Sequence, residues 1–353
     1  MLTSLFKPKP PLMLGLDIGT KYVKAILLEQ KGNHCHIKAL ACEPILGDVF
    51  TDREIKDFDA LNHAIKKVQH SIKVKVRDVA IAVSGTAVLT KVTQMPSGQS
   101  DIELEGQIEL EADSLIPYPL DDVYLDFEVL GTSIIEPGKD DVLLSVSHKN
   151  MIDSRITLLR ELELEPRIVD IEGYALGNSL IQFTEQPSDA ELCCLCIGAS
   201  QLQLTVIKDK QIRYAKELPF GTEHLIRDLS LVYNLEPEIA SKQLESNQLP
   251  EHWQRDIYPQ FLGNLQQQIN RVLQLYQSAT NDEPPKSLML CGGAAKITNL
   301  VDDLASDLNL QIQLFNPLAN MTSQVAMPIT HTLGSQFAIA AGLASRSFTQ
   351  CHI

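Results

Sequence analysis

Two short glycine segments, roughly half the chain apart, share a pattern that could bind a phosphate. Leu14–Thr20 reads Leu-Gly-Leu-Asp-Ile-Gly-Thr, and Cys194–Ala199 reads Cys-Leu-Cys-Ile-Gly-Ala. In each copy an apolar run ends at the glycine, Gly19 or Gly198, and another β-type run follows. A tight glycine turn exposes backbone N–H groups and lets a phosphate approach without a Cβ in the way. The repeat therefore predicts two hairpin turns that face each other across a cleft.

A third glycine element follows later in the chain. Leu288–Ala294 reads as a strand that ends in the pair Gly292-Gly293, which we expect to open a helix running through Leu308. Small residues at such a strand end allow a nucleoside to lie close to the backbone. A single glycine pair is weak evidence, but the three elements in this order predict a nucleotide site.

Each signal also has a purely structural interpretation. Asp17 could simply cap a hairpin turn, and Lys21 could be a solvated strand residue. The nine histidines show no metal-ligand spacing, and neither a P-loop nor a nucleophile elbow is present. An acidic set resembles a catalytic cluster but fits the solvated face of an amphipathic helix better. Its members are Glu103, Glu105, Glu109 and Glu111.

The elements that must position these residues alternate between strands and helices in both halves, which predicts an α/β fold. Apolar spacing predicts helices over 58–71 and, after the Ser100-x-x-Glu103 capping-box pattern, up to Ile116. Three β-type runs recur at 191–197, 202–208 and 212–218. A polar, proline-containing stretch at 186–189 is the best candidate for the boundary between two lobes.

Composition narrows the class of protein. The 353 residues suffice for two lobes, each with its own core. A net charge of −15 argues against nucleic acid or an anionic membrane surface as the main partner. The longest apolar runs are too short to cross a bilayer, and the first ten residues lack the features of a signal peptide, so we expect a cytoplasmic protein.

The seven cysteines predict buried, reduced thiols and not a disulfide framework. Cys193, Cys194 and Cys196 crowd one strand-like run. Alternation along a strand would send Cys193 and Cys196 to opposite faces, which suits neither a metal nor a redox pair.

The three glycine elements resemble the phosphate 1, phosphate 2 and adenosine motifs of the actin, sugar kinase and Hsp70 superfamily. Further segments make the chain similar to the PilM family of type IV pilus assembly proteins over almost its whole length. These segments are Val83–Lys91, Gln107–Asp113, Ile116–Leu120, Asp126–Val129, Pro219–Gly221, Asn316-Pro317 and Ala340–Ala344. The resemblance implies a two-lobed actin-like, ribonuclease H-like duplicated fold. Lobe I would span 1–185 with an inserted subdomain at about 76–149, and lobe II would span 186–353.

The resemblance also implies a site for ATP or ADP with Mg²⁺. Asp17 would organise the metal through water. The residues that would surround the nucleotide are Gly19, Thr20 and Lys21 at the β and γ phosphates, Gly198, Ala199, Ser200 and Gly221 in lobe II, and Gly292, Gly293 and Ala294 at the nucleoside.

One departure from the family pattern bears on chemistry. The second phosphate motif normally begins with an aspartate, but this chain has Cys196 there. A thiol cannot replace a carboxylate for Mg²⁺ or as a base of suitable strength, so we expect slow or absent ATP hydrolysis. Leu244 occupies the position where the family often carries a ribose-side lysine.

The function implied by the resemblance is that of a scaffold. It would capture the N-terminal cytoplasmic peptide of PilN between lobe I and the inserted subdomain, at the cytoplasmic face of the inner membrane and associated with it through that partner. An acidic surface suits this role because cytoplasmic tails of membrane proteins tend to be basic. One alternative is an active ATPase or small-molecule kinase with Asp170 or Glu172 as the base. Another is homo-oligomerisation into filaments like those of FtsA.

Overall fold

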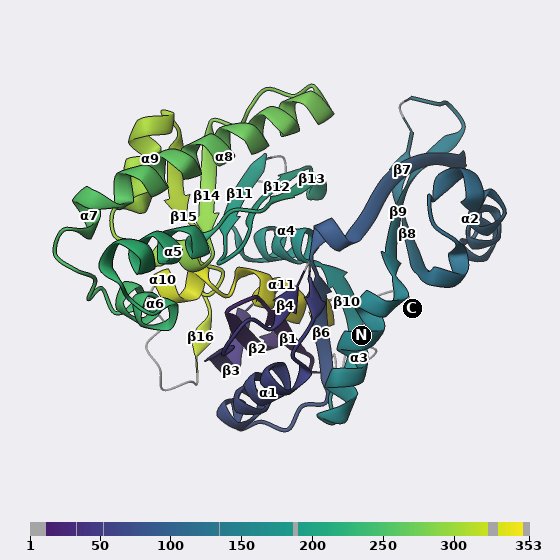
Figure 1. Cartoon of the computed structure of the whole chain (residues 1–353). Coiled ribbons are helices and arrows are strands. Elements are labelled where there is room, and N and C mark those ends of the chain that lie inside the picture. Colours follow the sequence, from purple (N-terminus) through teal and green to yellow (C-terminus); the bar gives the residue numbers. More distant parts are fainter. Residues whose placement is uncertain are drawn as a thin grey trace.

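The computed structural model describes residues 12–32, 34–51, 53–133, 135–185, 190–323 and 331–348. Its elements form an α/β fold with two lobes, each built on a mixed sheet, and a smaller subdomain that projects to one side (Figure 1). The predicted lobe boundary at 186–189 lies outside the described residues. Within the described ranges, every helix is too short or too polar to cross a bilayer.

The first sheet has the order β10-β6-β1-β2-β3-β16. Strand β1 pairs antiparallel with β2 and parallel with β6, and β2 pairs antiparallel with β3. The bounds are β1 Leu14–Ile18, β2 Tyr22–Lys31, β3 His34–Pro44, β6 Asp78–Val83, β10 Glu165–Ile171 and β16 Thr322–Ser323. The central strands are nearly continuous apolar runs buried on both faces, as expected for a sheet covered by helices on each side.

The second sheet repeats the first. Its order is β13-β12-β11-β14-β15, with β11 antiparallel to β12 and parallel to β14. Read from the other edge, β15-β14-β11-β12-β13 matches β10-β6-β1-β2-β3 strand for strand, so the sequence repeat reflects duplicated lobes. The bounds are β11 Leu192–Ile197, β12 Leu202–Lys208, β13 Gln211–Leu218, β14 Ser287–Cys291 and β15 Gln311–Leu314.

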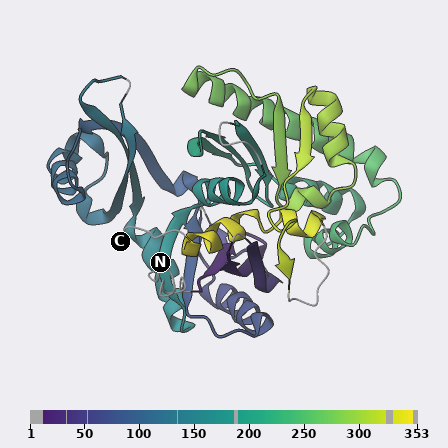
Figure 2. The ribbon, with the colours of Figure 1, turned by 180° about the vertical axis from the view of Figure 1, so that it is seen from behind.

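Two helices lie between the sheets, α4 (Glu172–Phe183) and α11 (Ala338–Ser345), as Figure 2 shows from behind. Helix α11 packs on α4 and β1 through small residues. A Cβ at Gly342 would stand 1.7 Å from the Ala175 carbonyl oxygen, and one at Gly15 would stand 2.1 Å from the Ala340 oxygen. Only glycine allows these close approaches, so the Ala-Ala-Gly-Leu-Ala segment of α11 packs tightly at the junction between the lobes.

The outer faces carry the remaining helices. Leu61 and Ile65 of α1 and Leu158 of α3 complete the first core, while Phe261 and Leu265 of α8 anchor the second. Helix bounds are α1 Phe58–Ile72, α3 Lys149–Glu161, α5 Thr222–Tyr233, α6 Pro237–Glu245, α7 Trp253–Asp256, α8 Tyr258–Thr280, α9 Leu300–Leu308 and α10 His331–Ser335. A small hairpin, β4 Phe50–Thr51 with β5 Glu54–Ile55, precedes α1.

The inserted subdomain is a three-stranded sheet, β7-β9-β8, with helix α2 on one face (Figure 1). Its bounds are α2 Asp101–Leu115, β7 Val88–Pro96, β8 Val123–Thr132 and β9 Lys139–His148. The predicted capping box is present, since Glu103 N donates to Ser100 Oγ and Ser100 N donates to Glu103 Oε2. The four glutamates of this helix are exposed, in agreement with the solvated-face interpretation.

Most predicted elements are confirmed within one or two residues, but one helix prediction is wrong. The paired glycines open a short 3-10 turn, Gly293–Lys296, and α9 begins only at Leu300. The break falls at Asn299, whose φ of 67° is left-handed and incompatible with a continuous α-helix. Strand β6 belongs to the first sheet and β7 to the sheet of the inserted subdomain, so the chain changes sheet at Ser84–Ala87.

Candidate functional site

A cavity of about 1070 Å³ is lined by residues of both lobes, and we call it the interlobe cavity. Its volume is at the upper end of what small-molecule sites provide. It brings together residues that are far apart in the chain. Among the residues predicted for the nucleotide site, Asp17, Gly19, Thr20, Lys21, Gly198, Ala199, Ser200, Gly292 and Gly293 line it.

The two glycine turns have the same backbone hydrogen bond. Gly19 N donates to the Tyr22 carbonyl oxygen at 3.1 Å, and Gly198 N donates to the Gln201 oxygen at 2.8 Å. Each glycine N–H is therefore already used in a hydrogen bond within its own turn. The N–H groups that a phosphate could use belong to the residues that follow each glycine. The turns approach one another closely, since Thr20 Oγ1 donates to Ser200 Oγ at 3.3 Å.

A buried ion pair lies beneath the first turn. Asp17 on β1 and Lys24 on β2 are register partners, and the Lys24 ammonium donates to Asp17 Oδ2. Burial alone would lower the pKa of Lys24, but the Asp17 carboxylate outweighs it and the net shift is upward. Lys24 is thus a fixed cation inside the cavity. The sequence analysis did not single out Lys24, although a lysine within the apolar run that opens β2 was a usable signal.

Neutral side chains take the corresponding places beneath the second turn. Cys196 on β11 and Gln203 on β12 are register partners, and both line the cavity. The hydrogen bond with Cys291 and burial raise the pKa of the Cys196 thiol well above its usual range, so it stays protonated. The cysteines of this strand are free and buried, and Cys193 packs in a different core cluster from Cys196, as predicted.

The two carboxylates considered as an alternative base lie in different places. Glu172, at the start of α4, lines the cavity, whereas Asp170 does not. Burial, reinforced by Glu217 and Asp17, raises the pKa of Glu172 to about 8. Asp170 lies 3.7 Å from the Arg346 guanidinium, and burial raises its pKa. Only Glu172 is placed to meet a ligand in the cavity.

Two of the predicted residues lie behind the cavity wall. A Cβ at Gly221 would stand 2.3 Å from the Ala199 oxygen, so this glycine lets the start of α5 pack directly on the second turn. Ala294 is buried in the second core. Leu244 lines the cavity where the family pattern often has a lysine. Gly292 has a φ of 91° and passes so close to Ile197 that only glycine fits.

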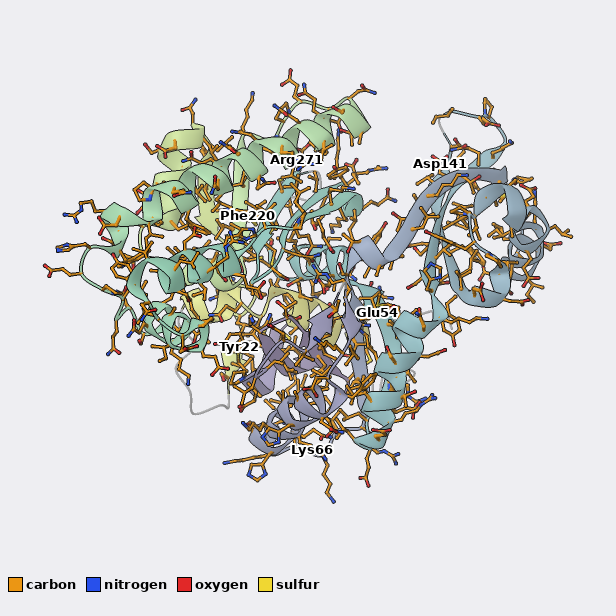
Figure 3. The ribbon with its side chains drawn as sticks, in the orientation of Figure 1. Tyr22, Glu54, Lys66, Asp141, Phe220 and Arg271 are labelled. Atoms are coloured by element: carbon orange, nitrogen blue, oxygen red, sulfur yellow. The ribbon has the colours of Figure 1, made fainter. Side chains whose placement is uncertain are left out.

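Polar contacts beside the first turn connect the two lobes. Lys21 Nζ lies 3.6 Å from Glu223 of α5, and the Tyr22 hydroxyl donates to Glu245 of α6. Figure 3 labels Tyr22 where β2 approaches α6. Burial, with help from Glu245, raises the pKa of Tyr22, so its hydroxyl remains a donor. The first turn is therefore tied to two helices of lobe II.

Duplicated sheets, two facing glycine turns and a cavity between them define the actin-like class of two-lobed proteins. A family model described as type IV pilus assembly protein PilM matches residues 15–348. The chain belongs to this PilM family and is an actin-like protein of type IV pilus assembly.

Solved structures agree on the fold. A PilM-PilN type IV pilus biogenesis complex is 24% identical with a TM-score of 0.80, covering 97% of this chain and 100% of that chain. The ethanolamine utilization protein EutJ from Carboxydothermus hydrogenoformans is 15% identical with a TM-score of 0.55, covering 98% and 93%.

Proposed function

We propose that this chain is a nucleotide-binding scaffold that captures the N-terminal peptide of PilN and hydrolyses ATP slowly or not at all. The observation that carries the proposal is that turns from both lobes converge on one cavity while a neutral thiol stands where catalysis would need a carboxylate. Backbone N–H groups bind phosphate without a base, so binding and hydrolysis can be separated. In this role the protein would sit at the cytoplasmic face of the inner membrane, held there by PilN.

Both ends of a nucleotide have suitable surroundings in the interlobe cavity. The polyphosphate would lie between the two turns, where Lys24 supplies positive charge. Gly292 and Gly293 leave room for the nucleoside, and Leu244 with Ile297 offers it apolar contact. We therefore take ATP or ADP as the cofactor class.

The side chains that line the cavity fit Mg²⁺ only when the phosphates of a nucleotide supply most of its ligands. Among the described residues, no three His, Cys, Asp or Glu side chains form a cluster that could hold a metal alone. Asp17 offers one buried carboxylate, which suits an ion that keeps several waters and binds with nucleotide. When bound, Mg²⁺ would neutralise phosphate charge. Asp17 would hold its water shell while Lys24 fixes the carboxylate in place.

The inserted subdomain has the charge that a basic peptide needs. Positions 92 to 138 contain eleven Asp and Glu and no Lys, Arg or His. Tyr118, Leu120 and Tyr124 are exposed, and the Tyr124 hydroxyl donates to Asp153 of α3 at 2.9 Å. Aromatic and acidic groups thus meet where the subdomain joins lobe I. Because cytoplasmic tails of inner-membrane proteins tend to be basic, this junction is the place we propose for the PilN peptide.

A hydrogen-bond chain links this subdomain to the cavity. Gln201, which lines the cavity, donates from Nε2 to Ser84 Oγ at 3.4 Å. Ser84 Oγ and Gly85 N both donate to Glu217 of lobe II, the latter at 2.7 Å. Ser84 and Gly85 are the residues through which the chain enters the subdomain. A nucleotide that moves the second turn would therefore act on the base of the peptide site.

Calorimetry with the full chain tests the proposal. We expect saturable, one-to-one binding of Mg-ATP with negligible phosphate release, and separate binding of a synthetic N-terminal PilN peptide. A peptide of the same composition in scrambled order is the control. Turnover that Asp17→Ala abolishes would instead favour the ATPase alternative, with Glu172 as its base. Failure of the PilN peptide to bind, with or without nucleotide, would remove the scaffold role.

A further inference from the structure

The side of helix α2 that faces away from the subdomain sheet is apolar and exposed. Ile102 is 81% exposed and Leu110 is 89% exposed, the two largest values among the large apolar side chains that the structure describes. With Gly106 between them at four-residue spacing, they form one row along the helix, which we call the outer ridge. The opposite side of α2 packs on the sheet through Leu104 and Ile108. Figures 1 and 2 show α2 at the outer edge of the subdomain, away from both lobes.

Gly106 leaves the middle of the outer ridge without a side chain. A Cβ at this position would meet nothing within 4 Å, so no contact with the described part of the chain requires a glycine. Glycine inside a helix weakens it relative to alanine, because its unfolded backbone has more freedom to lose. A helix position without a side chain does allow a second helix to approach closely, since the side chains at the contact set the distance between helix axes. The outer ridge thus offers two apolar anchors with a gap between them that a crossing helix would fill.

The charges of α2 indicate which partner fits the outer ridge. The helix contains six acidic residues and no Lys, Arg or His. By helical position Glu105 and Glu109 border the ridge on one side and Glu103 on the other, and all three are exposed. A second copy of this helix would bring acidic groups against acidic groups, and an anionic membrane surface would be repelled for the same reason. A helix whose apolar stripe is bordered by Lys and Arg complements both the anchors and the charges.

We propose that the outer ridge of α2 is a docking surface for a basic amphipathic helix of a partner protein. This surface is separate from the place proposed for the PilN peptide, which lies where Tyr124 of β8 meets Asp153 of α3. It is also independent of nucleotide in the interlobe cavity. The inference therefore gives the inserted subdomain a second binding surface, on the side that points away from the lobes.

Fluorescence anisotropy with a labelled synthetic peptide tests this assignment on the full chain. The peptide has about 20 residues, long enough to form a helix, with Ala and Leu along one stripe and Lys and Arg elsewhere. We expect saturable binding that weakens as salt rises, and no binding of the same peptide with Glu in place of Lys and Arg. Gly106→Leu fills the gap in the outer ridge and should lower the affinity at least about tenfold. Leu110→Ala removes one anchor and should lower it about tenfold.

Gly263→Leu on α8 is the matched control. Gly263 also lies inside a helix with open space at its Cβ position, but the residue four positions on is the polar Gln267. Both Gly→Leu changes should raise the melting temperature, because leucine favours a helix more than glycine does. Only Gly106→Leu should weaken peptide binding. A loss of binding together with a higher melting temperature cannot be caused by misfolding.

Several results would overturn the assignment. The basic peptide could fail to bind at low ionic strength, or it could bind Gly106→Leu as tightly as wild type, which would mean attraction to acidic charge alone. Self-association in sedimentation that Gly106→Leu abolishes would assign the outer ridge to a second copy. Cosedimentation with phosphatidylglycerol vesicles that Gly106→Leu abolishes would assign it to lipid. Weaker binding of the PilN peptide to Gly106→Leu than to wild type would mean that the two surfaces are one.

Discussion

Beneath the first glycine turn the chain places a charged pair, Asp17 and Lys24, and beneath the second it places the neutral Cys196 and Gln203 at the same register positions. The turns themselves are alike, down to the hydrogen bond that each glycine donates. Duplication has therefore preserved the backbone that can hold a phosphate, while the side chains below it have diverged. Under the proposed function, phosphate binding depends on the backbone of the two turns, and the capacity for hydrolysis depends on the side chains beneath them.

The largest expected effect comes from breaking the charged pair. Lys24→Met leaves the Asp17 carboxylate buried without its partner, which should cost about 3–5 kcal/mol. We expect a melting temperature lower by several degrees and loss of nucleotide binding. The matched substitution in lobe II, Gln203→Met, should leave stability unchanged within about 1 kcal/mol because no charge is orphaned.

The double variant Asp17→Asn with Lys24→Met is the control for this reasoning. It removes both charges and should recover most of the stability that Lys24→Met loses. Equal destabilisation by the Lys24 and Gln203 substitutions would show that the side-chain pairs beneath the two turns do not differ as described.

A second prediction restores a charge in lobe II. Cys196→Asp supplies the carboxylate that the family pattern has at this place, so we expect Mg²⁺-dependent phosphate release to rise by at least about tenfold. The same change buries a second negative charge near Asp17 and should lower the melting temperature in the absence of nucleotide. Cys196→Ser, which stays neutral, is the matched control. Unchanged turnover in Cys196→Asp would mean that something other than the thiol limits hydrolysis.

A smaller, pH-dependent effect is expected at Glu172. Its pKa of about 8 reflects burial first and the nearby Glu217 and Asp17 next, while Arg53 and Lys24 act in the opposite direction. Below pH 8 the carboxyl is mostly neutral, and above it the side chain becomes negative and repels phosphate. Triphosphate affinity should therefore fall several-fold between pH 7.5 and 9, and Glu172→Gln should flatten that dependence. The same pH profile in both proteins would exclude Glu172 as the cause.

The duplicated turns could be predicted from the sequence because glycine after an apolar run is a local signal. It also predicted the capping box of α2, which depends on four consecutive residues. Lys24 and Gln203 were missed because their meaning depends on which strand residues face each other across a hairpin. That register appears only once the strands are paired.

Two details could not be predicted from the sequence, for similar reasons. The break before α9 depends on the left-handed backbone of Asn299, which helical apolar spacing does not reveal. Gly221 was predicted to belong to the nucleotide site; it does not line the interlobe cavity, and its closest packing is against the second turn. A glycine needed for close packing and one needed for ligand approach look the same in a sequence. Only their neighbours in space distinguish them.

Backbone amide NMR during an ATP titration tests the central claim most directly. The resonances of Thr20 and Lys21 in one lobe and of Ala199 and Ser200 in the other should move together and give one dissociation constant. A response confined to one turn, or two different constants, would contradict a single polyphosphate held between the lobes.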